Sequence, residues 1–245
     1  MRAWMMIFLR QFVLSARAGW LSVSDGPGGF PFAVSVAVRL SDAIVDEIGE
    51  EPTYTYFNHY RSVNALIDQI LLRTGLWLQA HGARYLTVAA SQSRPDSPFE
   101  GRYSHKKAAC LAGLGSMGRN GLFLLREWGP RVRLGTLFTD WAGCAALAAG
   151  SSPDSGIDSG RDYGRDYGRT FSDPLHPLCA SCGRCVAACP AGALGLTGDD
   201  GAPAERDCLD PARCSAWMKK AYQHIGRGVV CGICVKVCPA AGRTP

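Results

Sequence analysis

Residues 179–190 read CASCGRCVAACP and hold four cysteines in the spacing C-x2-C-x2-C-x3-C, with a proline directly after the last one. This is the ligand spacing of bacterial proteins with two 4Fe–4S clusters, in which the fourth cysteine usually binds the other cluster. A shorter run, CGICVKVCP, follows at residues 231–239. Two clusters need eight thiolates and the two runs supply seven, so the eighth is Cys208 or Cys214, which lie between them.

Two other uses of clustered cysteines fit this pattern less well. Disulfide frameworks suit small secreted domains, whereas this chain has 245 residues, and nine of its eleven cysteines follow residue 178. Zinc ribbons pair C-x2-C motifs and do not use a triple run that ends in Cys-Pro. The sequence therefore predicts two 4Fe–4S clusters in a separate module. Because their thiolates must stay reduced, a cytoplasmic protein is expected.

Composition sets only broad limits. A hydrophobic content of 47% permits a sizeable core, in one large domain or two modest ones. The formal net charge of +5 is compatible with an anionic substrate, a cofactor phosphate or RNA, and selects none of them. The first 20 residues begin with an apolar run that resembles a Sec signal, but Arg10 interrupts it, so we expect a buried N-terminal helix leading into residues 20–23. No apolar run is long enough to cross a membrane.

Hydrophobic periodicity predicts strands that alternate with helices, which indicates an α/β layer structure. Strands are expected at residues 30–40, 85–90 and 131–139, and helices at 41–48, after 54–60 as far as Gly82, at 104–111 and at 214–225.

A change of composition divides the chain. Residues 146–173 are rich in Gly, Ser and Asp and contain the repeat GRDYGRDYGR, which predicts a flexible linker. The predicted domains are therefore an α/β domain at 1–145 and a ferredoxin-type module at 174–245.

The glycines of residues 113–118, GLGSMG, match G-x-G-x-x-G, which alone is a weak signal for a dinucleotide site. That fingerprint needs an apolar strand before it and an acidic residue about 20 positions later, and neither is present here. We therefore do not expect a Rossmann-type nicotinamide site, although the glycines permit a flat or anionic group to approach the backbone.

A longer stretch carries a family resemblance. Residues 104–140 read SHKKAACLAGLGSMGRNGLFLLREWGPRVRLGTLFTD, and their succession of A-G-L-G-x-x-G-[KR]-N, G-x-R-V-R-L and T-D resembles the epoxyqueuosine reductase family. That family is related to corrinoid-dependent reductive dehalogenases. The order of CASCGRCVAACP, RCSAW and CGICVKVCP is also similar, so the resemblance covers residues 20–239.

This resemblance implies a nitroreductase-like α/β domain that holds cobalamin, beside a double 4Fe–4S module that receives electrons from a ferredoxin or flavodoxin. It implies one cluster on Cys179, Cys182, Cys185 and Cys238 and another on Cys189, Cys214, Cys231 and Cys234. The corrinoid site would include Lys106, Gly113, Leu114, Gly115, Gly118, Arg119, Asn120 and Asp140.

The proton donor departs from the family pattern. The family's acidic residue corresponds to about Phe99 here, so Glu100 and His105 are the candidate catalytic acids. A histidine has an ordinary pKa of about 6.5 and is suited to this task, but it serves equally well as a hydrogen-bonded residue in the first turn of a helix.

The family's helical repeat extension, thought to help grip tRNA, does not occur in these 245 residues. A small-molecule or nucleoside substrate is therefore expected over full-length tRNA, and the sequence does not define an oligomeric state. Two alternatives remain. One is a ferredoxin-type electron-transfer protein without a corrinoid, and the other is a flavin reductase, because nitroreductase-like domains also bind flavin.

Overall fold

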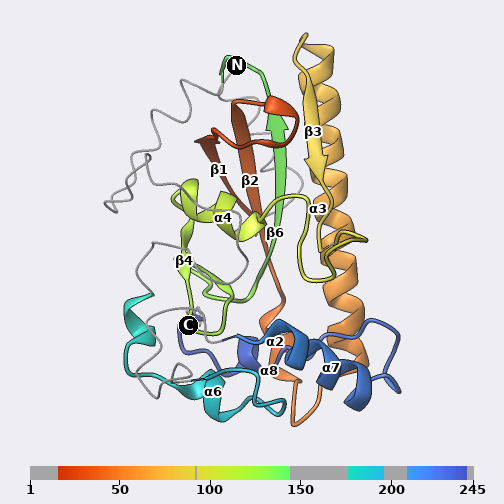
Figure 1. The fold of residues 1–245 in the computed structure, drawn as a ribbon, viewed down its shortest axis with the longest axis vertical. Coiled ribbons are helices and arrows are strands. Elements are labelled where there is room, and N and C mark those ends of the chain that lie inside the picture. The colour runs from red at the N-terminus through yellow and green to blue at the C-terminus, as the bar shows by residue number, and fades with distance from the viewer. Residues whose placement is uncertain (1–15, 92, 144–175, 196–208, 242–245) are drawn as a thin grey trace. The chain divides into compact units, whose positions relative to one another are not determined.

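The computed structural model describes residues 16–91, 93–143, 176–195 and 209–241 (Figure 1). The chain forms two compact units, each assembled from three segments. The first unit contains residues 1–39, 62–114 and 132–157, and the second contains residues 40–61, 115–131 and 158–245. The second unit thus includes two segments of the predicted α/β domain. The predicted linker at 146–173 lies outside the described residues, and the domain boundaries stay a prediction.

A four-stranded sheet forms the centre of the first unit. Its strand order is β1 (Ala16–Ser22), β2 (Phe32–Arg39), β6 (Val132–Thr139) and β3 (Tyr85–Val88), and every neighbouring pair is antiparallel. The predicted mixture of strands and helices is confirmed, and the three strands predicted from periodicity are all present. The nitroreductase-like assignment stays a prediction.

The first strand corrects the expectation of an N-terminal helix that leads into residues 20–23. Residues 16–22 are extended and pair with β2 in a register that sets Trp20 opposite Val34. Trp20 and Leu21 are both buried. Strand pairing supplies backbone partners along the whole length of the apolar β2, and it overrides the local preference of this segment. Residues 1–15 lie outside the described part of the chain.

Both faces of the sheet are covered. On one face, the rung formed by Leu21, Ala33 and Phe138 belongs to a hydrophobic cluster with residues of α4 (His105–Leu111) (Figure 1). On the other face, Gly135 lies against Ile67 and Leu71 of α3 (Tyr54–Ala80). These are two of the apolar residues at i, i+3 and i+4 spacing along the helix, so periodicity located the packed face correctly.

Short elements make up the second unit. These are α2 (Asp42–Asp46), the hairpin of β4 (Gly115–Met117) and β5 (Phe123–Leu125), α6 (Arg184–Ala187), α7 (Pro211–Ala221) and α8 (Ile233–Lys236). Arg131 ties segments together here: its guanidinium is only 4% exposed and bonds to Asp42 at 2.9 Å and Asp46 at 2.7 Å. A second anchor is a small apolar cluster of Phe57, Tyr222 and Val229.

Helix α7 begins three residues before the start predicted for it. Asp210 caps it, because its carboxylate accepts a hydrogen bond from the Arg213 N–H at 2.9 Å, and Pro211 occupies the first helical turn. The cap and the proline are both visible in the sequence, and they are stronger start signals than the apolar pattern. None of the helices among the described residues has the length and apolar character needed to cross a membrane.

We expect Gly135→Ala to destabilise the protein by about 1–3 kcal/mol, because an added Cβ would lie 2.3 Å from Ile67 Cγ2 and overpack the interface between β6 and α3. Urea unfolding measures the change. Gly49→Ala is the matched control, since a Cβ there meets nothing within 4 Å, and it should stay within about 0.5 kcal/mol of the parent chain. Equal effects of the two substitutions would contradict the packing argument.

Candidate functional site

The two cysteine runs fold into similar turns within the second unit. In each run a Cys-Gly-x-Cys segment begins a one-turn helix, α6 after Gly183 and α8 after Gly232. Both glycines have left-handed backbone angles, with φ of 61° and 74°. A residue with a Cβ adopts this conformation only at a cost, so glycine lets the chain reverse sharply between two cysteines. The turn brings neighbouring thiols onto the same side of the backbone.

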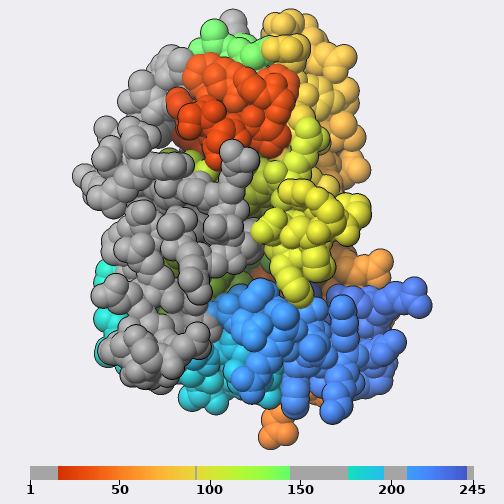
Figure 2. All heavy atoms as spheres, viewed as in Figure 1, coloured from red at the N-terminus to blue at the C-terminus, as the bar shows by residue number. Residues whose placement is uncertain are grey.

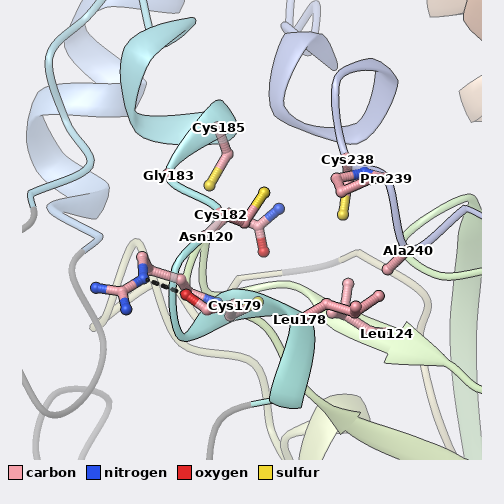
Figure 3. Close-up of a pocket in the computed structure, with 11 residues that line it drawn as sticks. Asn120, Leu124, Leu178, Cys179, Cys182, Gly183, Cys185, Cys238, Pro239 and Ala240 are labelled. Atoms are coloured by element: carbon pink, nitrogen blue, oxygen red, sulfur yellow. Dashed lines mark hydrogen bonds between the residues drawn. The ribbon is translucent and has the colours of Figure 1, made fainter.

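One set of four thiols surrounds a small cavity. Cys179, Cys182 and Cys185 from the first run and Cys238 from the second all line it. Figure 3 shows the sulfur atoms of Cys182, Cys185 and Cys238 directed into a common space. Burial raises the pKa of Cys185, and the nearby thiols of Cys179 and Cys182 raise it further. The pKa of Cys238 is raised in the same way, by burial and then by those same three thiols.

A second set forms around Cys234. Burial raises the pKa of Cys234, and the thiols of Cys231 and Cys214 add to the effect. Burial also raises the pKa of Cys214 to about 11, with Cys231 and Cys189 as its close thiol neighbours. Cys189, Cys214, Cys231 and Cys234 are therefore neighbours, and their assignment as one ligand set stays a prediction. Cys208 lies outside the described residues.

The chemistry of these donors suits iron–sulfur clusters. A cluster ligand must be a thiolate, so binding of the metal has to displace the thiol protons. Backbone N–H groups already point at sulfur: that of Arg119 lies 3.5 Å from Cys179 Sγ, and that of Ala193 lies 3.4 Å from Cys189 Sγ. Such hydrogen bonds stabilise the negative charge of a cluster and tune its potential.

One contact was not anticipated from the sequence. Tyr222 is buried, and its hydroxyl lies 4.0 Å from Cys231 Sγ and 3.5 Å from the indole N–H of Trp217. A thiolate at Cys231 accepts the tyrosine O–H, which places this side chain next to a predicted ligand. Nine residues separate Tyr222 from Cys231, and no sequence motif links them.

The glycine-rich segment joins a helix to a hairpin. Gly113 has φ of 67°, and its N–H donates to the Cys110 carbonyl, so it ends α4 as a left-handed cap. Leu114, whose N–H donates to the Ala109 carbonyl, is the next residue. Gly115 begins β4, where a Cβ would lie 2.0 Å from the Leu124 carbonyl oxygen. A Cβ on Gly118 would lie 2.8 Å from Asn120 Oδ1. The order helix–hairpin is not the strand–turn–helix order of a dinucleotide fingerprint.

Arg119 and Asn120 contact the cluster module directly. The Arg119 side chain donates to the carbonyls of Cys179 at 3.1 Å and Ala180 at 3.4 Å. The Asn120 amide donates to the Cys234 carbonyl at 3.5 Å. Both residues had been predicted to line a corrinoid site. The structure shows their side chains engaged with the loops that carry Cys179 and Cys234.

His105 lies at the start of α4 with both ring nitrogens bonded. Nδ1 lies 2.9 Å from Thr136 Oγ1 and Nε2 lies 3.2 Å from the Ala89 carbonyl. A carbonyl only accepts, so Nε2 carries the proton and Nδ1 accepts from the threonine hydroxyl. Burial is the main cause that lowers the pKa of His105. The neutral, doubly bonded ring fits the structural role foreseen for this histidine, and its role as a catalytic acid stays a prediction.

The remaining predicted site residues have different surroundings. Asp140 accepts from the backbone N–H of Arg84 at 2.8 Å and from its Nε at 2.6 Å, and these hydrogen bonds lower the pKa of its carboxyl. Glu100 ends a loop in which its own carbonyl accepts from the Arg94 N–H at 2.7 Å. Lys106 follows His105 in α4 and is partly exposed. No observation brings these three side chains to a common point.

Comparison with known proteins agrees with the cysteine pattern. A family model described as a 4Fe–4S double cluster binding domain matches residues 178–241. A tetrachloroethene reductive dehalogenase from Dehalobacter restrictus is 30% identical over 142 residues, which cover 53% of this chain and 21% of that protein. One from Desulfitobacterium hafniense is equally similar. The chain thus spans about a fifth of the length of these curated relatives.

Solved structures show the shared fold. A catabolic reductive dehalogenase has a TM-score of 0.62 and 18% identity, covering 93% of this chain and 30% of that one. The epoxyqueuosine reductase from Bacillus subtilis has a TM-score of 0.53 and 15% identity, covering 98% of this chain and 65% of that one. The chain therefore has the fold common to both groups and carries a double 4Fe–4S cluster domain, as its motifs implied.

We expect His105→Gln to weaken the dependence of stability on pH in the acid range. Since folding lowers the pKa of His105, the unfolded chain binds more protons below about pH 6.5, and the folded state loses stability there as pH falls. Glutamine keeps both hydrogen bonds and does not titrate. Urea unfolding at about pH 7.5 and about pH 5.5 should show a smaller loss in the variant. The exposed His81, changed to Gln, controls for removal of one imidazole. Unchanged pH dependence in His105→Gln would refute the assignment.

Proposed function

We propose that this chain is an iron–sulfur reductase that passes single electrons from a ferredoxin or flavodoxin through two 4Fe–4S clusters to a cobalamin-type cofactor. The observation that carries the proposal is the composition of the second unit. It contains both four-thiol sets together with residues 115–131, and Arg119 of that segment bonds to the Cys179 loop. The substrate is a small molecule or a nucleoside.

The proposed ligand sets exchange one cysteine between the two runs. Cys238 completes the set of the first run, and Cys189 completes the set of the second run with Cys214. This arrangement matches the rule that the fourth cysteine of such a run binds the other cluster. Cys185 is also among the thiols that act on Cys234, so the two proposed ligand sets are neighbours.

The corrinoid is proposed from Gly113 and from the relatives. An added Cβ at Gly113 meets nothing within 4 Å, so the backbone there is open to a flat group. One reductive dehalogenase structure is described with a mechanism for B12-dependent dehalogenation. When bound, a corrinoid supplies a reduced metal centre that reduces the substrate. The residues proposed to hold it are Lys106, Gly113, Leu114, Gly115, Gly118, Arg119, Asn120 and Asp140, of which Arg119 and Asn120 also bond to the loops of Cys179 and Cys234.

Glu100 is the better of the two proposed acids. His105 donates its only N–H to the Ala89 carbonyl, and burial keeps the ring neutral, so it has no proton ready for a substrate. Glu100 is partly exposed at the end of its loop. A general acid must reach the substrate and recover its proton from solvent, which suits a partly exposed carboxyl.

The names of the relatives suggest two kinds of substrate. The curated relatives are tetrachloroethene reductive dehalogenases, which favours a halogenated small molecule. One epoxyqueuosine reductase structure contains an epoxyqueuosine-modified tRNA stem loop, which favours a modified nucleoside. The sequence similarity to the dehalogenases, at 30% over 142 residues, makes the small molecule the first choice.

A second candidate function is electron transfer without a corrinoid. It is favoured by His105, one of the two proposed acids, whose ring is bonded at both nitrogens. Such a protein needs the clusters and no proton donor.

We expect Cys214→Ala to lose one cluster. Anaerobic reconstitution with iron and sulfide should give about eight iron atoms per parent chain and about four in the variant, because Cys214 lies among the second set of thiols. Cys208→Ala is the matched control and should retain about eight. The reverse result, with iron lost only from Cys208→Ala, would mean that Cys208 is the eighth ligand.

We expect the reconstituted chain to retain one cobalamin. Cobalt counting, together with an EPR spectrum of cob(II)alamin that lacks its lower axial base, measures this. Gly113→Val should lower cobalamin retention while leaving the iron count unchanged, since a side chain fills the open space at that backbone and strains its φ of 67°. Full iron with no cobalt would leave the electron-transfer function, and a yellow fluorescent extract would identify a flavin instead.

A further inference from the structure

Helix α7 separates two kinds of residue by face. Cys214, Met218 and Ala221, at i, i+4 and i+7, lie on one side, where Met218 Sδ accepts the N–H of Cys231 at 3.3 Å. Arg213, Trp217 and Lys220 share the same spacing about 100° around the helix, Lys219 lies further round, and all four are exposed. The helix therefore presents a predicted cluster ligand inward and a cationic surface with an aromatic residue outward.

The described charged residues of the cysteine-rich segment are mostly basic. Among the described residues at 176–195 and 209–241 there are six arginines and lysines and a single acidic residue, Asp210. Lys219 and Lys220 end α7, where they also complement the helix dipole. Figure 2 shows the blue atoms of this segment at the molecular surface. A surface of this kind attracts an acidic protein and orients it during encounter.

Two contacts connect Trp217 of this surface to Cys231, a predicted cluster ligand. Trp217 is 38% exposed, and its indole N–H donates to the Tyr222 hydroxyl at 3.5 Å. That hydroxyl lies 4.0 Å from Cys231 Sγ. Large exposed aromatic residues beside positive charge are typical anchors of protein interfaces. An electron carrier bound over Trp217 would thus lie close to the second set of thiols.

We propose that the outer face of α7, formed by Arg213, Trp217, Lys219 and Lys220, is the docking surface for an acidic one-electron carrier protein. This inference deepens the proposed function, and it identifies the second set of thiols as the entry point. In the step itself, one electron leaves the reduced carrier and enters the cluster, and no bond forms or breaks.

A rival basic groove is less suited to docking. Arg131, Arg184 and Lys236 line it beside Cys238. Two of these cations are already bound within the unit, since Arg131 pairs with Asp42 and Asp46, and the Lys236 ammonium donates to the Ile48 carbonyl. Arg184 is the third cation of this groove, so its substitution by glutamate tests whether the carrier binds there.

The first experiment measures how fast reduced flavodoxin reduces the iron–sulfur absorbance of the reconstituted chain in anaerobic stopped flow. Lys219→Glu/Lys220→Glu should slow the second-order rate roughly tenfold at low ionic strength and flatten its dependence on salt. Arg126→Glu is the matched control, an exposed cation of the same unit that is not on α7, and it should stay within about twofold. Reduction by dithionite, which needs no docking, should be equal in all variants.

The second experiment measures binding alone. The dissociation constant for immobilised oxidised flavodoxin should rise about tenfold in Trp217→Ala and in the double lysine variant, with iron content unchanged. If Arg184→Glu weakens binding and the α7 variants do not, the rival groove is the docking surface and the inference is wrong. If dithionite reduces the clusters and flavodoxin does not, the partner is wrong and the proposed function stands. If the parent chain assembles no clusters, both fail.

Discussion

The second unit depends on one constraint, the convergence of eight thiols into two sets of four. The first run supplies three closely spaced thiols to one set and the second run supplies two to the other, while the last cysteine of each run joins the opposite set. The two runs must therefore pack side by side before either set is complete. The left-handed glycines Gly183 and Gly232 satisfy the local part of this constraint, and the contacts of α6 with α8 satisfy the long-range part. Metal binding would then stabilise the unit by linking segments that are far apart in sequence.

The same constraint accounts for the residues around the thiols. A buried cluster is negatively charged and needs hydrogen-bond donors, so backbone N–H groups at Arg119 and Ala193 point at sulfur. Arg119 and Asn120 add side-chain bonds to the loops of Cys179 and Cys234, which ties the β4–β5 hairpin region to the thiol sets. A segment predicted to contact a cofactor thus helps to position the cluster ligands, and electron transfer out of the clusters would pass close to it.

Patterns with a short period were predictable from the sequence, and pairings over long distances were not. Strands β2, β3 and β6 and the packed face of α3 follow from residue alternation and helical spacing. Strand β1 was missed because its identity depends on pairing with β2, not on its own residues. The cysteine spacing was informative because cluster geometry dictates it, whereas the contact of Tyr222 with Cys231 arises only from tertiary packing. Arg131 is similar: its alternation with Arg133 on one strand gave no sign of its pairing with Asp42 and Asp46.

The predicted catalytic residues show most clearly what chemistry needs beyond residue type. His105 was a candidate because imidazole titrates near neutral pH, yet burial lowers its pKa and its Nε2 proton is donated to the Ala89 carbonyl. Asp140, which was predicted to bind the corrinoid, has its carboxylate bonded to Arg84. Cysteine ligands differ from such acids, because four thiols at the right spacing have few alternative uses. A site is easier to predict when its chemistry fixes the spacing of several residues at once. The cysteines proposed to carry electrons meet this condition, whereas a proton donor is a single residue, so the electron path is better defined here than the proton path.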